Sequence, residues 1–365
     1  MIPTTDNSVI YVLCPSHIVT GGIEAVHQLV DKLRKFGHNA NIVPLPQVRN
    51  PALLQYRNYE VEFASHIEDD PRNLLITTEV NPRQLDHYSS IRKALWWLSV
   101  DNHEKLAEGF EFDDPKNKSV VHFVQSAFAH NFLSQKGVET IYPLTDYLHA
   151  EYFRNIRPQK HNRVLYTPIK GADAYVDRLI RADPSIEWRP LKGLIRKAHA
   201  QALREGKVYV DFGSHPGKDR QPREAAVNGC CVIVGLKGSA ACPEDMSIPD
   251  RYKFPLEPLD GTAILSTLRA CLAEHGERRH DFDAYVDGVI QEERRFEQEI
   301  LSIFGGTPRR TRRSPRAIAL RNTWLFVRQN KAPTILRGLA NEFLPLAITN
   351  GIRRRYRAMV GTSIS

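Results

Sequence analysis

Two hydrophobic periods alternate along the first half of the chain. Residues 9–16 (VIYVLCPS) are almost continuously apolar, which is typical of a strand buried in a parallel sheet. Residues 23–33 space their apolar side chains at the helical period, and Gly37 marks the end of that helix. Further apolar runs follow with helical stretches between them: NANIVPL, NLLITTEV, KALWWLSV, SVVHFVQS and ETIYPL. This alternation predicts a doubly wound parallel sheet.

The pattern weakens over residues 143–161 and then resumes. A strand-like run (RVLYTPIKG) opens the second half, and helices and strands alternate again up to two long terminal helices (LDGTAILSTLRACLAEHG and DFDAYVDGVIQEERRFEQEILSIFG). We therefore predict two Rossmann-like domains facing a cleft, the first over residues 1–155 and the second over 156–305. Residues 306–365 form a tail.

The composition is that of an ordinary globular protein, with 42% hydrophobic and 25% charged residues. The five cysteines are an odd number without a CxxC pair, which argues against a disulfide framework or zinc site and for a reducing compartment. The N-terminus lacks the basic and apolar regions of a signal peptide, and no run reaches the roughly eighteen apolar residues of a membrane span. We expect a cytoplasmic protein.

The tail differs in charge from the rest of the chain. It carries thirteen Lys and Arg against one acid, a net charge of +12, so residues 1–305 hold about −4 of the total of +8. RRTRRSPR predicts a disordered basic linker, and AIALRNTWLFVRQN and TILRGLANEFLPLAI are short amphipathic stretches. Cations beside apolar faces favour an anionic membrane surface. Nucleic acid is the weaker alternative, because no nucleic-acid-binding fold accompanies the tail.

Residues 207–240 combine a strand (KVYVDFG), a polar loop (SHPGKDRQ), a helix that begins near Pro222 and a second strand (CCVIVG). The loop holds His215, Lys218 and Arg220 just before the helix. A helix N-terminus with nearby cations suits a phosphate group, since its free N–H groups and dipole attract anions. The alternative is an ordinary strand-to-helix connection whose loop is solvated.

The segment PREAAVNGCCVI resembles the donor-binding segment of retaining glycosyltransferases of the GT-B fold. The resemblance implies that Glu224 holds the ribose hydroxyls of a nucleotide sugar, and that the backbone of the turn from Asp211 to Gly213 approaches its phosphates and sugar. Two features depart from the family pattern. The first acid is Asp211 rather than the usual Glu, and it lies farther from Glu224 than the family's spacing, so ribose binding carries over better than sugar recognition.

Two other segments resemble the same enzymes. TGGIEAVHQL resembles their Gly-Gly-x-Glu segment, so Gly21, Gly22 and Glu24 would line the cleft; Glu24 could equally stabilise the dipole of its helix. Lys170 and Gly171 resemble the Lys-Gly whose lysine binds the donor's diphosphate, and a strand-end ammonium is chemically suited to that task. The alternative for Lys170 is a solvated surface lysine.

The end of the run KALWWLSV is a candidate acceptor side. Asp101, Asn102 and His103 follow this strand, and Glu79 and Ser126 follow its neighbours, so all of them are expected near the cleft. Asp101 and His103 are candidate catalytic groups, although a histidine in a loop is more often structural.

Two functions remain open. The first is a metal-independent, retaining glycosyltransferase of surface polysaccharide or glycan synthesis, with a nucleotide-diphosphate sugar as donor and a saccharide or lipid-linked acceptor. No metal is expected, because Asp69-Asp70 and Asp113-Asp114 lie in polar loops away from the donor motif. The second is a non-catalytic nucleotide- or lipid-binding protein of the same fold, tethered by its tail.

Overall fold

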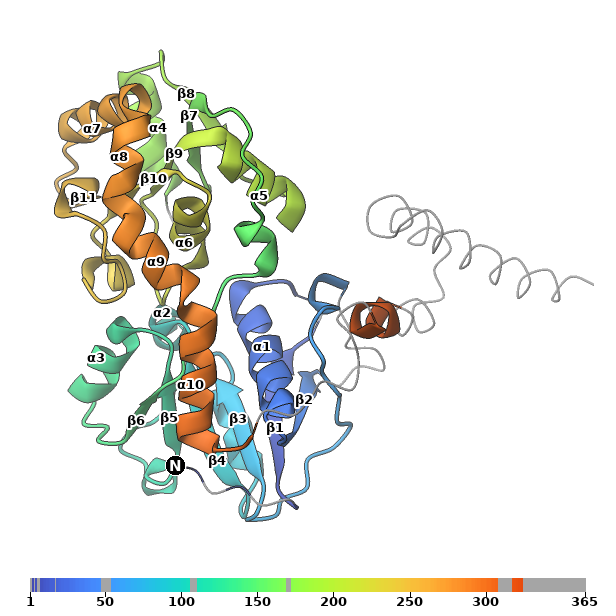
Figure 1. The fold of residues 1–365 in the computed structure, drawn as a ribbon. Helices are drawn as coiled ribbons and strands as arrows, with labels where there is room; N and C mark the ends of the chain where they lie inside the picture. Colours follow the sequence, from blue (N-terminus) through green and yellow to red (C-terminus); the bar gives the residue numbers. More distant parts are fainter. Residues whose placement is uncertain are drawn as a thin grey trace, which may run out of the picture.

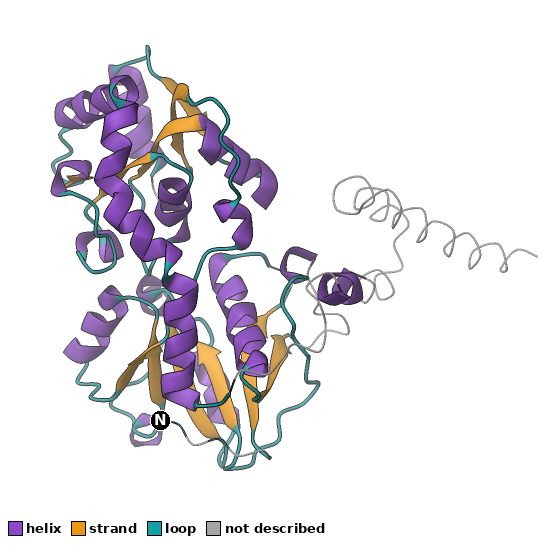
Figure 2. Cartoon of the chain, in the orientation of Figure 1, coloured by secondary structure: helices purple, strands orange, loops and turns teal. Residues whose placement is uncertain are grey.

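Two parallel sheets with helices on both faces make up the protein (Figure 1, Figure 2). The structure is a computed structural model that describes residues 2, 4, 7–16, 18–46, 54–105, 110–168, 172–307 and 317–323. The predicted fold class, two doubly wound domains of the α/β type, is confirmed.

The first sheet has six strands in the order β2-β1-β3-β4-β5-β6. These are β1 (Val9–Pro15), β2 (Asn39–Leu45), β3 (Leu74–Thr78), β4 (Arg92–Trp97), β5 (Val121–Val124) and β6 (Ile141–Pro143). Its helices are α1 (Gly21–Lys35), α2 (Val100–Lys105) and α3 (Ala127–Gln135). The connection between β3 and β4, where the alternating pattern predicts a helical stretch, holds only a short 3-10 helix, Pro82–His87.

The second sheet has five strands in the order β11-β10-β9-β7-β8. These are β7 (His161–Tyr166), β8 (Glu187–Pro190), β9 (Gly206–Asp211), β10 (Cys231–Gly235) and the two-residue β11 (Lys253–Phe254), which the sequence pattern did not predict. Its helices are α4 (Asp173–Ala182), α5 (Arg196–Glu205), α6 (Arg220–Val227) and α7 (Gly261–Ala273). Gly229, at φ +76°, adopts the left-handed conformation that ends α6.

The chain returns to the first domain at its end. After α8 (His275–Arg278), α9 (Asp283–Ile290) packs on the second domain, and α10 (Glu292–Phe304) crosses to the first (Figure 1). Phe296, Ile300 and Ile303 lie in the core of the first domain. The structure here differs from our division at residue 305, because α10 belongs by packing to the domain of residues 1–155.

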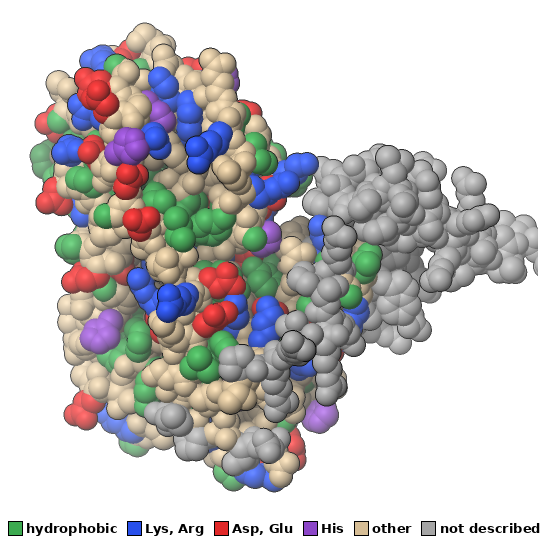
Figure 3. Space-filling model, viewed as in Figure 1, with side chains coloured by type: hydrophobic (Ala, Val, Ile, Leu, Met, Phe, Trp, Pro, Cys, Tyr) green, Lys and Arg blue, Asp and Glu red, His purple; other side chains and the backbone are tan. Residues whose placement is uncertain are grey.

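The chain therefore crosses between the domains twice. At the first crossing Tyr147 lies in the core of the first domain and Leu148 in that of the second. At the second crossing Val289 and Phe296 mark the two sides. On the face seen in Figure 3, basic and acidic side chains lie next to one another near the middle of the molecule. Lys32 of α1 forms ion pairs with Glu293 and Glu297 of α10, each at 2.5 Å.

Of the basic tail, the structure describes residues 306–307 and 317–323, and the latter are helical. Asn322 donates to the carbonyls of Arg57 and Tyr59 at 2.8 and 3.0 Å, and Arg321 pairs with Glu62. The predicted linker RRTRRSPR and the second amphipathic stretch lie outside the described residues. Within the described part of the chain, no helix is both long and apolar enough to span a bilayer.

Lys160 ties three elements of the second domain together. Its ammonium donates to the carbonyls of Gly206, Asn228 and Leu203 at 2.7, 2.8 and 3.2 Å, at the ends of α5 and α6 and the start of β9. Lys160→Met leaves these carbonyls without their donor, and we expect the free energy of unfolding in urea to fall by about 2–3 kcal/mol.

The exposed Lys192 offers the matched control. Lys192→Met should change the free energy of unfolding by less than about 0.5 kcal/mol. Equal effects of the two substitutions would contradict a structural role for Lys160.

Candidate active site

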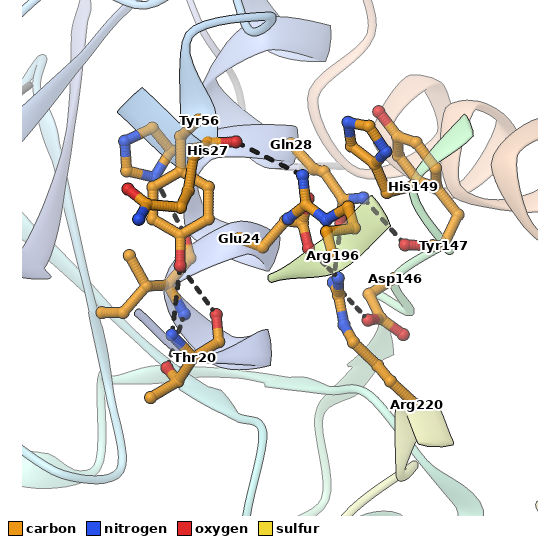
Figure 4. A network of polar contacts seen from close by, with 12 residues as sticks. Thr20, Glu24, His27, Gln28, Tyr56, Asp146, Tyr147, His149, Arg196 and Arg220 are labelled. Carbon is orange, nitrogen blue, oxygen red and sulfur yellow. Dashed lines mark hydrogen bonds and ion pairs between the residues drawn. The ribbon is translucent and has the colours of Figure 1, made fainter. Parts of the chain in front are cut away.

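Three helices begin where the two domains meet. Gly21, Arg196 and Arg220 are the first residues of α1, α5 and α6, so three helix N-termini with their unpaired N–H groups converge on one region (Figure 4). The carboxyl ends of β1, β8 and the β9 loop lie immediately before these helices. Ligands of open α/β sheets bind at such strand ends, so this region is the candidate site.

Glu24 of α1 binds two arginines of the other domain. Arg220 and Arg196 approach its carboxylate at 2.6 and 2.7 Å, and Tyr59 donates to it at 2.9 Å. Glu24 is only 5% exposed; burial acts to raise its pKa, but the two arginines outweigh burial and the pKa is lowered. Glu24 is therefore a buried anion that joins the domains.

The glycine pair makes room for this contact. A Cβ atom at Gly21 would lie 3.0 Å from Cδ of Arg220, and one at Gly22 would lie 3.4 Å from Cδ1 of Leu98. The aliphatic part of Arg220 thus lies directly over Gly21, which together with Gly22 begins α1 rather than forming a loop before it. The structure brings these three predicted site residues together.

A second set of charges lies beneath Arg220. Arg223 is fully buried and binds Asp146 at 2.8 Å and Glu292 at 2.7 Å. Arg220 also binds Asp146, at 2.7 Å, and Lys218 binds Glu292 at 2.8 Å. Burial acts to raise the pKa of Asp146, but Arg223, Arg220 and Lys218 reverse the effect and lower it. The predicted phosphate-loop cations Lys218 and Arg220 are therefore each paired with carboxylates.

The turn after β9 forms a compact polar group. Gly213 donates its N–H to Asp211 at 3.1 Å. His215 is fully buried, with Nε2 3.7 Å from Asp211 and Nδ1 3.1 Å from Asp219. Among the described residues, this is the one group of three whose ligand atoms are close enough to share a cation, all lying within 4.8 Å of one another. The two ring nitrogens face different carboxylates, but the hydrogen-bond contact of Nε2 is with the backbone carbonyl of Asp211, at 3.5 Å.

Glu224 lies on α6, which begins at Arg220, two residues before the predicted start near Pro222, and it is 7% exposed. Burial is the main cause that raises its pKa from 4.5 to about 7. His199 of α5 lies 3.7 Å from the carboxylate and 3.2 Å from the hydroxyl of Tyr152, and burial lowers the pKa of His199 to about 4. Nε2 of His199 has no hydrogen-bond partner among the described residues.

Sequence reasoning missed several of these groups. Tyr152 gave no motif signal, and His199 and Arg196 sit in a helix (RKAHAQALRE) whose pattern indicates only an amphipathic element. Asp146 and Glu292 lie at the two domain crossings, where the pattern carries no chemical signature. They become apparent only in the structure, where both are buried and each binds the oppositely charged Arg223.

The candidate acceptor-side residues lie elsewhere. Asp101 and His103 are on α2 rather than in a loop. Nε2 of His103 accepts from the N–H of Phe110 at 2.8 Å, and its ring centroid lies 5.0 Å from that of Trp97 and 5.9 Å from that of Phe112. His103 thus packs in an aromatic cluster of the first domain, and the described contacts do not join it to Glu24 or Glu224.

The strand ends of the first domain instead hold a domain contact. Glu79, whose pKa burial raises to about 7, accepts from the N–H of Leu98 at 2.9 Å. Val100 donates to the carbonyl of Pro216 at 2.7 Å, and Asp245 accepts from the N–H groups of Ala127 and Phe128 at the start of α3. Lys170 and Gly171, predicted to bind the diphosphate, lie outside the described residues.

The sequence matches no protein-family model and no curated protein. Solved structures do share the two-sheet architecture. HepE from Anabaena, in complex with UDP and glucose, has 11% sequence identity over 80% of this chain and 98% of HepE, at a TM-score of 0.56. WaaG, described as a glycosyltransferase involved in lipopolysaccharide biosynthesis, has 12% identity over 82% of this chain and all of WaaG, at 0.52.

The fold is GT-B. TarM is also similar, with 13% identity and a TM-score of 0.52 over 66% of this chain, which spans only 56% of TarM. At such identities the similarity establishes the GT-B fold alone.

The pKa of Glu224 makes stability depend on pH. Because its pKa is higher in the folded than in the unfolded protein, folding favours the protonated carboxyl, and stability falls as pH rises from about 4.5 to about 7. Glu224→Gln removes this cost. At pH 8 the variant should be more stable than the unsubstituted protein by about 3 kcal/mol, and near pH 4 the difference should vanish.

Urea unfolding of both proteins at pH 4 and pH 8 measures this difference. The exposed Glu277→Gln serves as control and should shift stability by less than about 0.5 kcal/mol at either pH. A difference between Glu224→Gln and the unsubstituted protein that is the same at both pH values would contradict a buried, protonated Glu224.

Proposed function

We propose that this protein is a glycosyltransferase that moves a sugar from a nucleotide-diphosphate sugar to a saccharide or lipid-linked acceptor. The observation that carries the proposal is a GT-B fold whose donor-like segment, with Glu224 on α6, begins at the carboxyl edge of the second sheet and faces the first domain. UDP is the first donor nucleotide to test, because HepE was solved with UDP and glucose.

We assign the donor to the second domain and the acceptor to the first. In this proposal the Glu224 carboxylate accepts hydrogen bonds from the ribose hydroxyls, and the neighbouring Nε2 of His199 offers a further polar contact. The amides at the start of α6 and the ammonium of Lys170 then face the diphosphate. As the glycosidic bond breaks, negative charge grows on that diphosphate, and fixed N–H groups and cations stabilise it.

Lys218 and Arg220 would contribute by exchanging partners. Both bind carboxylates in this structure, and a diphosphate offers them a stronger anion at the same helix end. We propose transfer with retention of configuration and without a metal. A divalent ion that raises the rate and whose effect is lost in Asp211→Asn would instead make the group of Asp211, His215 and Asp219 a metal site.

We also propose that the basic tail binds an anionic membrane surface at the cytoplasmic face, which would bring the protein to acceptors of surface polysaccharide synthesis. Its charge of +12 beside a body of about −4 supports this.

Activity is tested by incubating the full chain with UDP-, GDP- and ADP-sugars, with and without saccharide acceptors, and measuring released nucleoside diphosphate by mass spectrometry. Release that depends on an acceptor supports transfer. Tight nucleotide binding without release under any condition would favour the non-catalytic alternative.

Glu224→Ala should weaken nucleoside diphosphate binding. At pH 8, above its pKa of about 7, Glu224 is a charged acceptor whose lost hydrogen bonds cost about 1.5–3 kcal/mol, so we expect the Kd measured by calorimetry at that pH to rise roughly ten- to a hundredfold. Glu277→Ala, an exposed glutamate of α8, is the control. An unchanged Kd in a folded Glu224→Ala protein would remove the ribose assignment.

Lys170→Ala should act on turnover. If the ammonium stabilises the leaving diphosphate mainly in the transition state, kcat should fall roughly tenfold or more while the Kd of the nucleotide changes little. Lys118→Ala, in the first domain, tests the loss of an unrelated exposed lysine. Near-normal kcat in Lys170→Ala would make this residue a surface lysine.

A further inference from the structure

Exposed apolar side chains gather beside the candidate site. The described residues contain nine exposed large hydrophobic side chains, and six of them fall in three pairs. We call these six the apolar rim: Ile18, Val19, Phe153, Ile156, Leu194 and Ile195. They are between 36% and 52% exposed. Scattered exposed apolar residues need no explanation, but a gathering of this kind around one region indicates an interaction surface.

Each pair adjoins a residue of the site. Val19 precedes Thr20, whose N–H donates to Tyr56 at 3.1 Å. Ile195 precedes Arg196, which binds Glu24 and the carbonyl of Gln55.

The third pair of exposed apolar residues, Phe153 and Ile156, also adjoins a residue of the site. Phe153 comes directly after Tyr152, the partner of His199 beside Glu224. Figure 4 shows Thr20, Tyr56 and Arg196 grouped around Glu24. The apolar rim therefore borders the region in which the helix N-termini of both domains converge.

Two of the three segments that carry the apolar rim are basic. Residues 153–157 and 192–197 contain no acid, and they carry four exposed cations, namely Arg154, Arg157, Lys192 and Lys197. Among these, Arg154 pairs with Glu151 but remains 53% exposed. Aliphatic and aromatic side chains interspersed with Lys and Arg fit a bilayer, since the apolar groups enter the acyl boundary while the cations meet anionic headgroups.

The described part of the tail approaches the same side of the molecule. Asn322 binds the backbone of Arg57 and Tyr59, and the hydroxyl of Tyr59 donates to Glu24. The described helix thus ends at residue 323 on the segment that contacts Glu24, and the sequence continues with Trp324, Leu325 and Phe326.

We propose that the apolar rim docks on an anionic lipid bilayer. The folded body itself then contacts the membrane, with the site beside the lipid surface. The presentation of a lipid-linked acceptor to the site by this contact rests on the proposed function; the bilayer contact itself does not.

The test places a tryptophan in the apolar rim of the full chain. Ile195→Trp is compared with Leu236→Trp, which is 40% exposed and follows β10, on the far side of the sheet from β8. Both proteins are mixed with phosphatidylglycerol–phosphatidylcholine vesicles whose acyl chains carry bromine, a quencher of tryptophan fluorescence. Because both variants contain the same tail, binding through the tail contributes equally to both.

We expect clearly greater quenching of Ile195→Trp than of Leu236→Trp with anionic vesicles. Arg157→Ala combined with Lys197→Ala should weaken sedimentation with these vesicles roughly tenfold or more, since each cation near the surface contributes about 1 kcal/mol. The matched pair Lys118→Ala and Lys136→Ala, on exposed positions of the first domain, should leave it unchanged.

Equal quenching of the two tryptophans would overturn the proposal. So would concentration-dependent dimerisation that Leu194→Ser with Ile195→Ser abolishes, because the apolar rim would then be covered by a second copy of the chain. Neither measurement uses a donor or an acceptor. Failure here therefore leaves the transferase proposal standing, and a failed nucleotide-release assay leaves bilayer contact standing.

Discussion

Arg223 carries a charge at a position that water does not reach. Its guanidinium meets Asp146 at the first domain crossing and Glu292 at the second, and Arg220 extends the cluster from Asp146 to Glu24. Removing such ions from water costs several kcal/mol each, and only well-placed opposite charges offset that cost. The domains therefore have one arrangement in which every member of the cluster is paired. That requirement constrains how the two sheets face each other.

The fold could be predicted largely from hydrophobic period. Near-continuous apolar runs such as that of β10, and glycine stops such as Gly229, mark strands and helix ends locally. The domain against which α10 packs could not be predicted in this way. Phe296, Ile300 and Ile303 show that one face of this helix is buried, but nothing in a periodic pattern says which of two cores receives it.

The sequence indicates which charged residue types lie in the candidate site, but it does not indicate which residues pair with one another. The sequence places cations in the loop before α6, yet Glu24, the partner of Arg220, is 196 positions away. For His103 the sequence neighbours misled the prediction. They are polar, but in the structure the ring packs against Trp97 and Phe112. Charge complementarity between distant segments becomes visible only once the chain is folded. For this reason a sequence motif indicates Glu224, whereas Tyr152 and His199, which lie beside it, carry no such signal.

The double crossing also constrains motion. Two covalent connections between rigid bodies permit mainly rotation about the line that joins them, as two hinges do for a door. Arg223 binds a carboxylate at each connection, so its ion pairs lie along that line and can persist while the domains rotate. Glu24 lies off this axis on α1, and its contacts with Arg220 and Arg196 must lengthen as the angle grows. The ion pairs of Arg223 would thus persist during domain rotation, whereas those of Glu24 would break, although both sets consist of arginine and carboxylate side chains.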